Sequence, residues 1–199
     1  MVKIKICGLK RLEDIKIVNK YKPDYIGFVF ADSKRKVSHD SAYQLKLNLD
    51  SDITSVGVFV DAGQDEILKL FNDGVIEMAQ LHGMESEGYI LDLKEKTNGE
   101  LKIIKAIEMT EDVDLLRYND SHADYLLLDS GKGSGKTFDW RLIKSGLKRE
   151  FFLAGGLNTS NICDAINEFD PYAIDLSSSL EVDGYKDENK IKEIMEAIN

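Results

Sequence analysis

The sequence is poor in the features that divide a chain into separate parts. It has only two prolines among 199 residues, and it shows no low-complexity or linker-like segment. One domain over residues 1–199 is therefore expected, with enough chain to bury a sizeable core. No apolar run approaches the roughly 20 residues of a membrane span, and the start, MVKIKICGLK, is too short and too charged for a secretory signal. We expect a protein that lies inside the cell and outside the membrane.

Cysteine and histidine are also scarce. The two cysteines, Cys7 and Cys163, lie far apart in the sequence, and without a secretory signal they favour free thiols in a cytoplasmic protein over a disulfide. The three histidines, His39, His82 and His122, show no metal-ligand spacing. The sequence therefore predicts no metal site.

Positive charge is in deficit as well. Lysine and arginine number 26 against 36 aspartates and glutamates, which gives a formal net charge of −10. No block of basic residues interrupts this balance, so binding to nucleic acid or to an anionic membrane surface is not expected. An anionic ligand would need a locally positive site, such as a helix N-terminus or a well-placed arginine.

What the chain does contain is an alternation of short apolar runs with amphipathic stretches. Runs rich in valine, isoleucine and leucine predict strands over 2–7, 24–30, 55–60, 76–81, 101–107, 123–129, 151–154 and 172–177. Helical periodicity predicts helices over 12–21, 66–71, 113–118, 161–169 and 188–198, with a weaker one over 85–96. Helix N-caps are expected at Ser38 or Asp40, Asp65, Thr159 or Asn158, and Asp187.

Strands that alternate with helices are parallel, which places the chain in the α/β class. A doubly wound open sheet and a closed (β/α)8 TIM barrel both satisfy this pattern. Eight units, too little sequence for a second domain and the lack of a GxGxxG motif after the first strand favour the barrel. Because such barrels typically need about 250 residues, its helices and loops must be short.

In a barrel of this kind the active site forms where the strands end. The last two predicted strands end in Gly155-Gly156 and Ser177-Ser178-Ser179. The glycine pair either serves turn geometry alone or lets backbone N–H groups approach a phosphate. Because these two strand ends are the usual phosphate site of the fold, the sequence favours a bound phosphate there.

Two residues at strand ends are candidates for acid–base chemistry. Cys7, read alone, is most simply a small buried apolar residue; at the barrel mouth it can act as an acid or a base. Asp129 ends a very apolar strand, where a carboxylate either binds a loop amide or serves as a catalytic acid. Strands 1 and 6 are expected to face each other across the mouth, so the pair could flank one small substrate.

Other polar positions carry weaker predictions. Arg35 is the most plausible anion clamp outside the phosphate site. His82 either lines the pocket or makes a structural hydrogen bond. Cys163 is predicted to lie in the core, beside Ile162. The segment 131–140 lacks the spacing of a phosphate-binding P-loop, and we interpret it as a mobile loop that closes over the substrate and leads into a helix at Asp139.

The order of motifs resembles the phosphoribosylanthranilate isomerase family of tryptophan biosynthesis. The resemblance runs through the whole chain, with one motif at nearly every strand end. The motifs are KICGL (5–9), GFVF followed by SKR (33–35), VGVFV (56–60), QLHG (80–83), LLLDS (126–130), GSGKTFDW (133–140), GGLN (155–158), DLSSSLE (175–181) and GYKD (184–187).

This resemblance implies a TIM barrel that catalyses a cofactor-free Amadori rearrangement of N-(5-phosphoribosyl)anthranilate. It implies Asp129 as the general acid that opens the ribose ring and Cys7 as the general base that removes the C2′ proton. Arg35 would hold the anthranilate carboxylate, and Gly155, Gly156, Ser177 and Ser178 the phosphate, with Gln80 and His82 also in the binding site. The sequence leaves monomer and homodimer open.

One position departs from the family pattern. Ser179 stands where the family usually has glycine, and a serine would strain the phosphate loop if the backbone there needs a positive φ. Two other hypotheses remain. One is the Amadori isomerase of histidine biosynthesis, which uses a carboxylate where this chain has Cys7 and is built from two similar halves. The other is a non-catalytic barrel that binds a phosphorylated metabolite.

Overall fold

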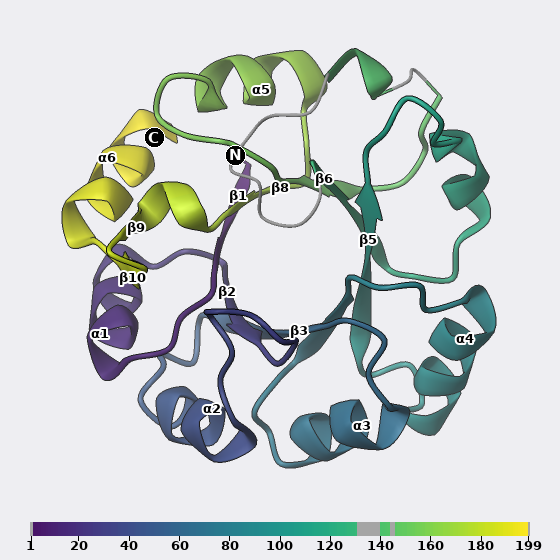
Figure 1. Ribbon diagram of the computed structural model, residues 1–199, viewed down its shortest axis with the longest axis horizontal. Helices are drawn as coiled ribbons and strands as arrows, with labels where there is room; N and C mark the ends of the chain where they lie inside the picture. The colour runs from purple at the N-terminus through teal and green to yellow at the C-terminus, as the bar shows by residue number, and fades with distance from the viewer. Residues whose placement is uncertain (1, 131–139, 144–145, 199) are drawn as a thin grey trace.

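The computed structural model describes residues 2–130, 140–143 and 146–198. Eight parallel strands, hydrogen-bonded in chain order, close into a barrel as predicted. Figure 1 shows the ring of strands with the helices around its outside. The strands are β1 (Lys3–Cys7), β2 (Tyr25–Val29), β3 (Thr54–Phe59), β4 (Met78–Leu81), β5 (Lys102–Glu108), β6 (Tyr125–Asp129), β7 (Phe151–Leu153) and β8 (Ala173–Leu176).

The helices of the described residues are short, which is how a chain of this length completes the barrel. The α-helices are α1 (Leu12–Tyr21), α2 (His39–Lys46), α3 (Gln64–Asn72), α4 (Glu87–Lys96), α5 (Ile162–Phe169) and α6 (Glu188–Ile198). Three 3₁₀ helices span Leu115–Asp120, Trp140–Leu142 and Ser178–Leu180, and a small antiparallel hairpin joins β9 (Glu181–Val182) to β10 (Tyr185–Lys186). None of the helices described is both long and apolar enough to cross a membrane.

Two hydrophobic layers hold the barrel together. The larger lies between the strands and the helices, and it includes Ile6 and Leu128 from the strands and Ile15 and Ile191 from the helices. The smaller fills the barrel interior and includes Phe152, which is fully buried. Because side chains alternate along a strand, every second residue points inward.

Some local predictions are confirmed and others are wrong. Ser38 caps α2, its Oγ accepting a hydrogen bond from the Ser41 amide at 3.2 Å. Asp187 precedes α6 and accepts from the Lys190 amide at 3.0 Å. The predicted caps at Asp65 and at Thr159 or Asn158 are wrong, because α3 begins after Gly63 and α5 after Asn161.

The predicted helix over 113–118 is a 3₁₀ helix instead, at Leu115–Asp120. Its segment is only six residues long, and a run this short makes few of the i to i−4 hydrogen bonds that sustain an α-helix. The prediction that Cys163 lies in the core is also wrong: the residue is exposed. Helix α5 buries Ile162 and Ala165, and one step along a helix is a turn of about 100°, which carries Cys163 to the outer face.

Candidate active site

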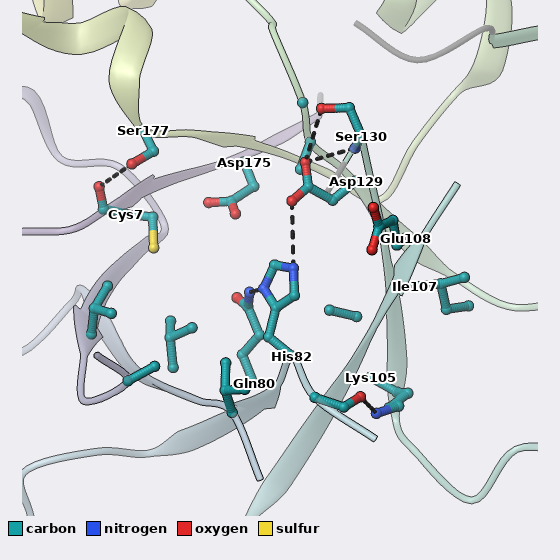
Figure 2. Close-up of a pocket in the computed structure, with 18 of the residues that line it drawn as sticks. Cys7, Gln80, His82, Lys105, Ile107, Glu108, Asp129, Ser130, Asp175 and Ser177 are labelled. Carbon is teal, nitrogen blue, oxygen red and sulfur yellow. Dashed lines mark hydrogen bonds and ion pairs between the residues drawn. The ribbon is translucent and has the colours of Figure 1, made fainter. Parts of the chain in front are cut away.

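A large pocket opens at the C-terminal ends of the strands, where the fold predicts an active site. All the residues that the sequence nominated for the site line it. They are Cys7, Arg35, Gln80, His82, Asp129, Gly155, Gly156, Ser177 and Ser178. Figure 2 shows the Cys7 sulfur and the Asp129 carboxylate on different sides of this space, with Asp175 between them and His82 below Asp129.

Cys7 is the last residue of β1, and it is 7% exposed. Its neighbour across the strand pair is Gly27, and a Cβ there would lie only 2.6 Å from the Cys7 sulfur. The missing side chain on β2 therefore provides the space that the thiol occupies. Burial raises the pKa of the Cys7 thiol, while the nearby charges of Lys5 and Lys186 oppose that rise.

Asp129 is the last residue of β6 and is likewise buried. Its Oδ1 accepts a hydrogen bond from the Ser130 amide at 2.8 Å, and its Oδ2 lies 3.4 Å from His82 Nε2. Gly155 packs against this group so closely that a Cβ would lie 3.0 Å from Asp129 Oδ1 and 2.6 Å from Ser130 Oγ. One carboxylate oxygen is thus fixed by the backbone, and the other faces a histidine and the pocket.

The predicted phosphate loops have the backbone that glycine allows. Gly155 and Gly156 both adopt positive φ, 83° and 65°. The turn geometry alone therefore explains the pair, whether or not it also binds an anion. Ser177 donates from its Oγ to the Cys7 carbonyl at 3.1 Å, which ties the end of β8 to the end of β1. Ser179 lies in a 3₁₀ helix and is not among the non-glycine residues of positive φ in the described chain. The backbone strain considered for a serine at this position is therefore not present.

Arg35 already has a partner in the protein. Its Nε donates to Glu181 Oε1 at 2.6 Å and its Nη2 to Glu181 Oε2 at 2.8 Å, a bidentate pair. Lys186 also reaches Glu181 Oε1 at 3.0 Å and the Ser177 carbonyl at 3.0 Å. Although burial opposes ionisation, the hydrogen bonds and charges of Arg35 and Lys186 lower the pKa of Glu181 to about 2. Glu181 is therefore a carboxylate that orients the arginine.

Sequence reasoning gave no site role to Lys5, Asp175, Glu181 or Lys186. For two of them a signal was present: Lys5 shares the face of β1 with Cys7, and Asp175 interrupts an apolar strand. Glu181 and Lys186 lie on the hairpin after β8, and only the fold brings them to Arg35. The predicted closing loop over 131–140 falls, apart from Trp140, outside the described residues. Within the described part of the chain, no group of three His, Cys, Asp or Glu side chains could hold a metal ion.

Fold and site together define a (β/α)8-barrel enzyme whose polar mouth places a thiol and a carboxylate around one small-molecule pocket. The family model for N-(5'-phosphoribosyl)anthranilate isomerase matches residues 4–197. An N-(5'-phosphoribosyl)anthranilate isomerase from Endomicrobium trichonymphae is 46% identical, covering 100% of this chain and 98% of the relative. The chain belongs to the family of N-(5'-phosphoribosyl)anthranilate isomerases, which are aldose–ketose isomerases of tryptophan biosynthesis.

Solved structures agree with this assignment. The crystal structure of phosphoribosyl anthranilate isomerase from Thermus thermophilus superposes with a TM-score of 0.89 at 29% identity, covering 99% of this chain and 98% of that one. A second isomerase of this family, in complex with reduced 1-(o-carboxyphenylamino)-1-deoxyribulose 5-phosphate, has a TM-score of 0.84 at 33% identity. It covers the same shares of the two chains, 99% and 98%. The barrel is thus shared over its whole length.

Proposed function

We propose that this protein converts N-(5-phosphoribosyl)anthranilate to 1-(2-carboxyphenylamino)-1-deoxyribulose 5-phosphate by general acid–base catalysis, without a cofactor. The observation that carries the proposal is one pocket lined by both Cys7 and Asp129, in a chain of this isomerase family. The structural relative that binds a reduced carboxyphenylamino-deoxyribulose phosphate supports the substrate class. Such a rearrangement moves protons among carbon, nitrogen and oxygen, which needs an acid and a base.

The two proposed catalytic residues act in sequence. Asp129, protonated at the start, gives its proton to the ribose ring oxygen as the bond from that oxygen to C1′ breaks. The anthranilate nitrogen supplies the electron pair that forms the Schiff base. The Cys7 thiolate then removes the C2′ proton, which leaves an enolamine, and tautomerisation with protonation at C1′ gives the ketone.

We assign the carboxylate and the phosphate of the substrate to different parts of the pocket. The guanidinium of Arg35 has a second N–H edge besides the one that faces Glu181, and this edge suits the anthranilate carboxylate. The backbone around Gly155 and Gly156 and the serines Ser177 and Ser178 would hold the phosphate. Gln80 and His82 line the wall between the two catalytic groups.

The remaining proposals concern the whole protein. Residues 1–199 would act as one catalytic domain on a small phosphorylated substrate, with no nucleic acid or membrane as a partner. The free thiols of Cys7 and Cys163 suit a reducing cytoplasm. A monomer or a homodimer would serve this chemistry, since every proposed site residue comes from one chain; one relative, from Thermotoga maritima, is described as dimeric.

The test is the loss of phosphoribosylanthranilate fluorescence on addition of purified protein. We expect turnover by the wild type and a fall in kcat of about 10²–10⁴ for Cys7→Ser and for Asp129→Asn. Cys163→Ser is the matched control, because it makes the same atomic change at an exposed cysteine. A wild type without activity would refute the function, whereas full activity in either variant would refute only the role given to that residue.

A further inference from the structure

A continuous line of polar contacts runs along the wall of the pocket from β1 to β6. Lys5 Nζ lies 2.8 Å from Gln80 Oε1, and Gln80 Nε2 lies 3.1 Å from His82 Nδ1. His82 Nε2 in turn faces Asp129 Oδ2 at 3.4 Å. Figure 2 shows the last two contacts, with the imidazole between Gln80 and Asp129.

The charge on Lys5 determines which atom donates and which accepts in each hydrogen bond of this line. The Lys5 side chain is fully buried and also contacts Asp175 Oδ1 at 2.9 Å. Although burial opposes the charged form, the Asp175 carboxylate and the Cys7 side chain outweigh it and raise the pKa of Lys5. Lys5 is therefore an ammonium, which has three donors and no acceptor. Only the oxygen of the Gln80 amide can face it.

The orientation of the amide then determines the tautomer of His82. With its oxygen toward Lys5, Gln80 presents its NH₂ group to His82 Nδ1. An NH₂ group can only donate, so Nδ1 must be the unprotonated, accepting nitrogen, and the ring proton sits on Nε2. We propose that Lys5 is a positioning residue that, through Gln80, fixes His82 as the neutral Nε2–H tautomer with its N–H directed at Asp129.

This arrangement matters because of the acid role proposed for Asp129, on which the catalytic part of the inference rests. After Asp129 gives up its proton, a facing N–H stabilises the carboxylate that remains. In the other tautomer the Nε2 lone pair would face Asp129 and accept its proton in a hydrogen bond, so the proton would be held by the histidine rather than offered to the substrate oxygen. Gln80 is only 1% exposed, and this burial restricts rotation of its amide.

The experiment reads the ring nitrogens of His82 directly by ¹⁵N NMR of histidine-labelled protein at mildly alkaline pH, which favours the neutral imidazole. A His82→Asn spectrum assigns the signals among the three histidines. We expect the wild type to show a protonated Nε2 and an unprotonated Nδ1. A wild type that is protonated on Nδ1 would overturn the proposal.

Gln80→Glu is the discriminating variant, because it keeps the shape and the Lys5 contact but replaces the donor with an acceptor. We expect a proton to appear on Nδ1 and kcat to fall roughly tenfold or more, with KM changing less. Gln44→Glu, at an exposed position of α2, is the control for the added charge and should change neither. An unprotonated Nδ1 in Gln80→Glu would refute the tautomer assignment, and an unchanged kcat with a switched tautomer would refute the catalytic consequence.

A second variant tests Lys5 itself. Lys5→Met combined with Asp175→Asn removes the ammonium without leaving an unpaired buried carboxylate. Gln80 can then turn its amide either way, so we expect His82 to become a mixture of both tautomers. A pure Nε2–H signal in this variant would show that Lys5 does not determine the tautomer of His82. Because the NMR result needs no turnover, an inactive wild type would refute the proposed function while leaving the tautomer assignment to be judged by the spectra.

Discussion

The base and the mouth of the barrel interior are built from the same strands but have different roles. The base is packed for stability, and the mouth forms the pocket. At the base, Tyr172 accepts a hydrogen bond from Lys3 at 2.9 Å, and its hydroxyl also meets those of Tyr25 at 2.9 Å and Tyr125 at 3.2 Å. The rings of Tyr25 and Tyr125 pack edge-on against Phe152, with centroids 5.4 and 5.7 Å away. Large side chains fill the base and pair their polar atoms with one another.

At the mouth two of these strands, β1 and β6, end in the ionisable residues Cys7 and Asp129, which line the pocket. On β1 the change occurs along one face, from Lys3 through Lys5 to Cys7, and on β6 from Tyr125 through Leu127 to Asp129. The base buries apolar area, whereas the mouth gathers charges whose desolvation opposes stability. The residues that stabilise the fold therefore lie at the base of the barrel, and the residues proposed for catalysis lie at its mouth.

The stability of the barrel should depend most on the packing at its base. Phe152→Ala removes a fully buried ring from the interior layer and should lower the free energy of unfolding by about 3–5 kcal/mol. Urea unfolding measures this, with Phe71→Ala on the surface of α3 as a control that should cost less because Phe71 is only partly buried. Turnover per folded molecule should stay within a few-fold of the wild type. A loss as large as that of Asp129→Asn would mean that activity at the mouth depends on the packing of the base.

A substitution at the mouth should weaken substrate binding while leaving the packing of the base intact. Arg35→Ala should raise KM by roughly tenfold to a hundredfold, because hydrogen bonds to a charged group contribute about 1.5–3 kcal/mol, and it should lower kcat less. Steady-state kinetics measure both constants. Lys34→Ala, which removes the same charge from an exposed neighbour, should leave them near wild type. A defect confined to kcat would contradict a binding role for Arg35.

The contribution of the mouth to stability should be small and should depend on pH. The pKa of Glu181 is lowered from its usual 4.5 to about 2, so the ionised form stabilises the fold above about pH 4.5 and that contribution is lost as pH falls toward 2. Glu181→Gln should therefore flatten the fall in unfolding free energy between about pH 5 and 2, as followed by denaturant titration. Glu13→Gln, at an exposed position of α1, should keep the wild-type slope. Equal slopes for Glu181→Gln and wild type would show that the mouth is neutral for stability.

The sequence predicted the barrel and the members of the pocket because strand ends follow from alternation, and a closed parallel barrel brings all strand ends to one side. Cys7 and Asp129 could be placed in this way from their own strands. The wrong predictions depended on helix phase and helix length. They are the burial of Cys163 and the α-helix expected after β5.

The pairing of polar side chains lay beyond sequence reasoning. Arg35 and Glu181 are 146 residues apart, and Lys5 and Gln80 are 75 apart. Nothing local marks either contact, because each depends on where two loops or two inward-facing positions meet. The roles of Arg35, Gln80 and His82 in substrate binding therefore stay predictions, although all three line the pocket.

The glycine beside Cys7 has a consequence for protein design. A designer who wished to install a thiol base at the end of a strand in another barrel would have to choose two positions together. The first receives the cysteine, and the second is its partner in register on the adjacent strand, which here is Gly27. Any side chain at the second position would begin 2.6 Å from the sulfur. A search of scaffolds for such a site would therefore look first for a strand end that already has a glycine next to it.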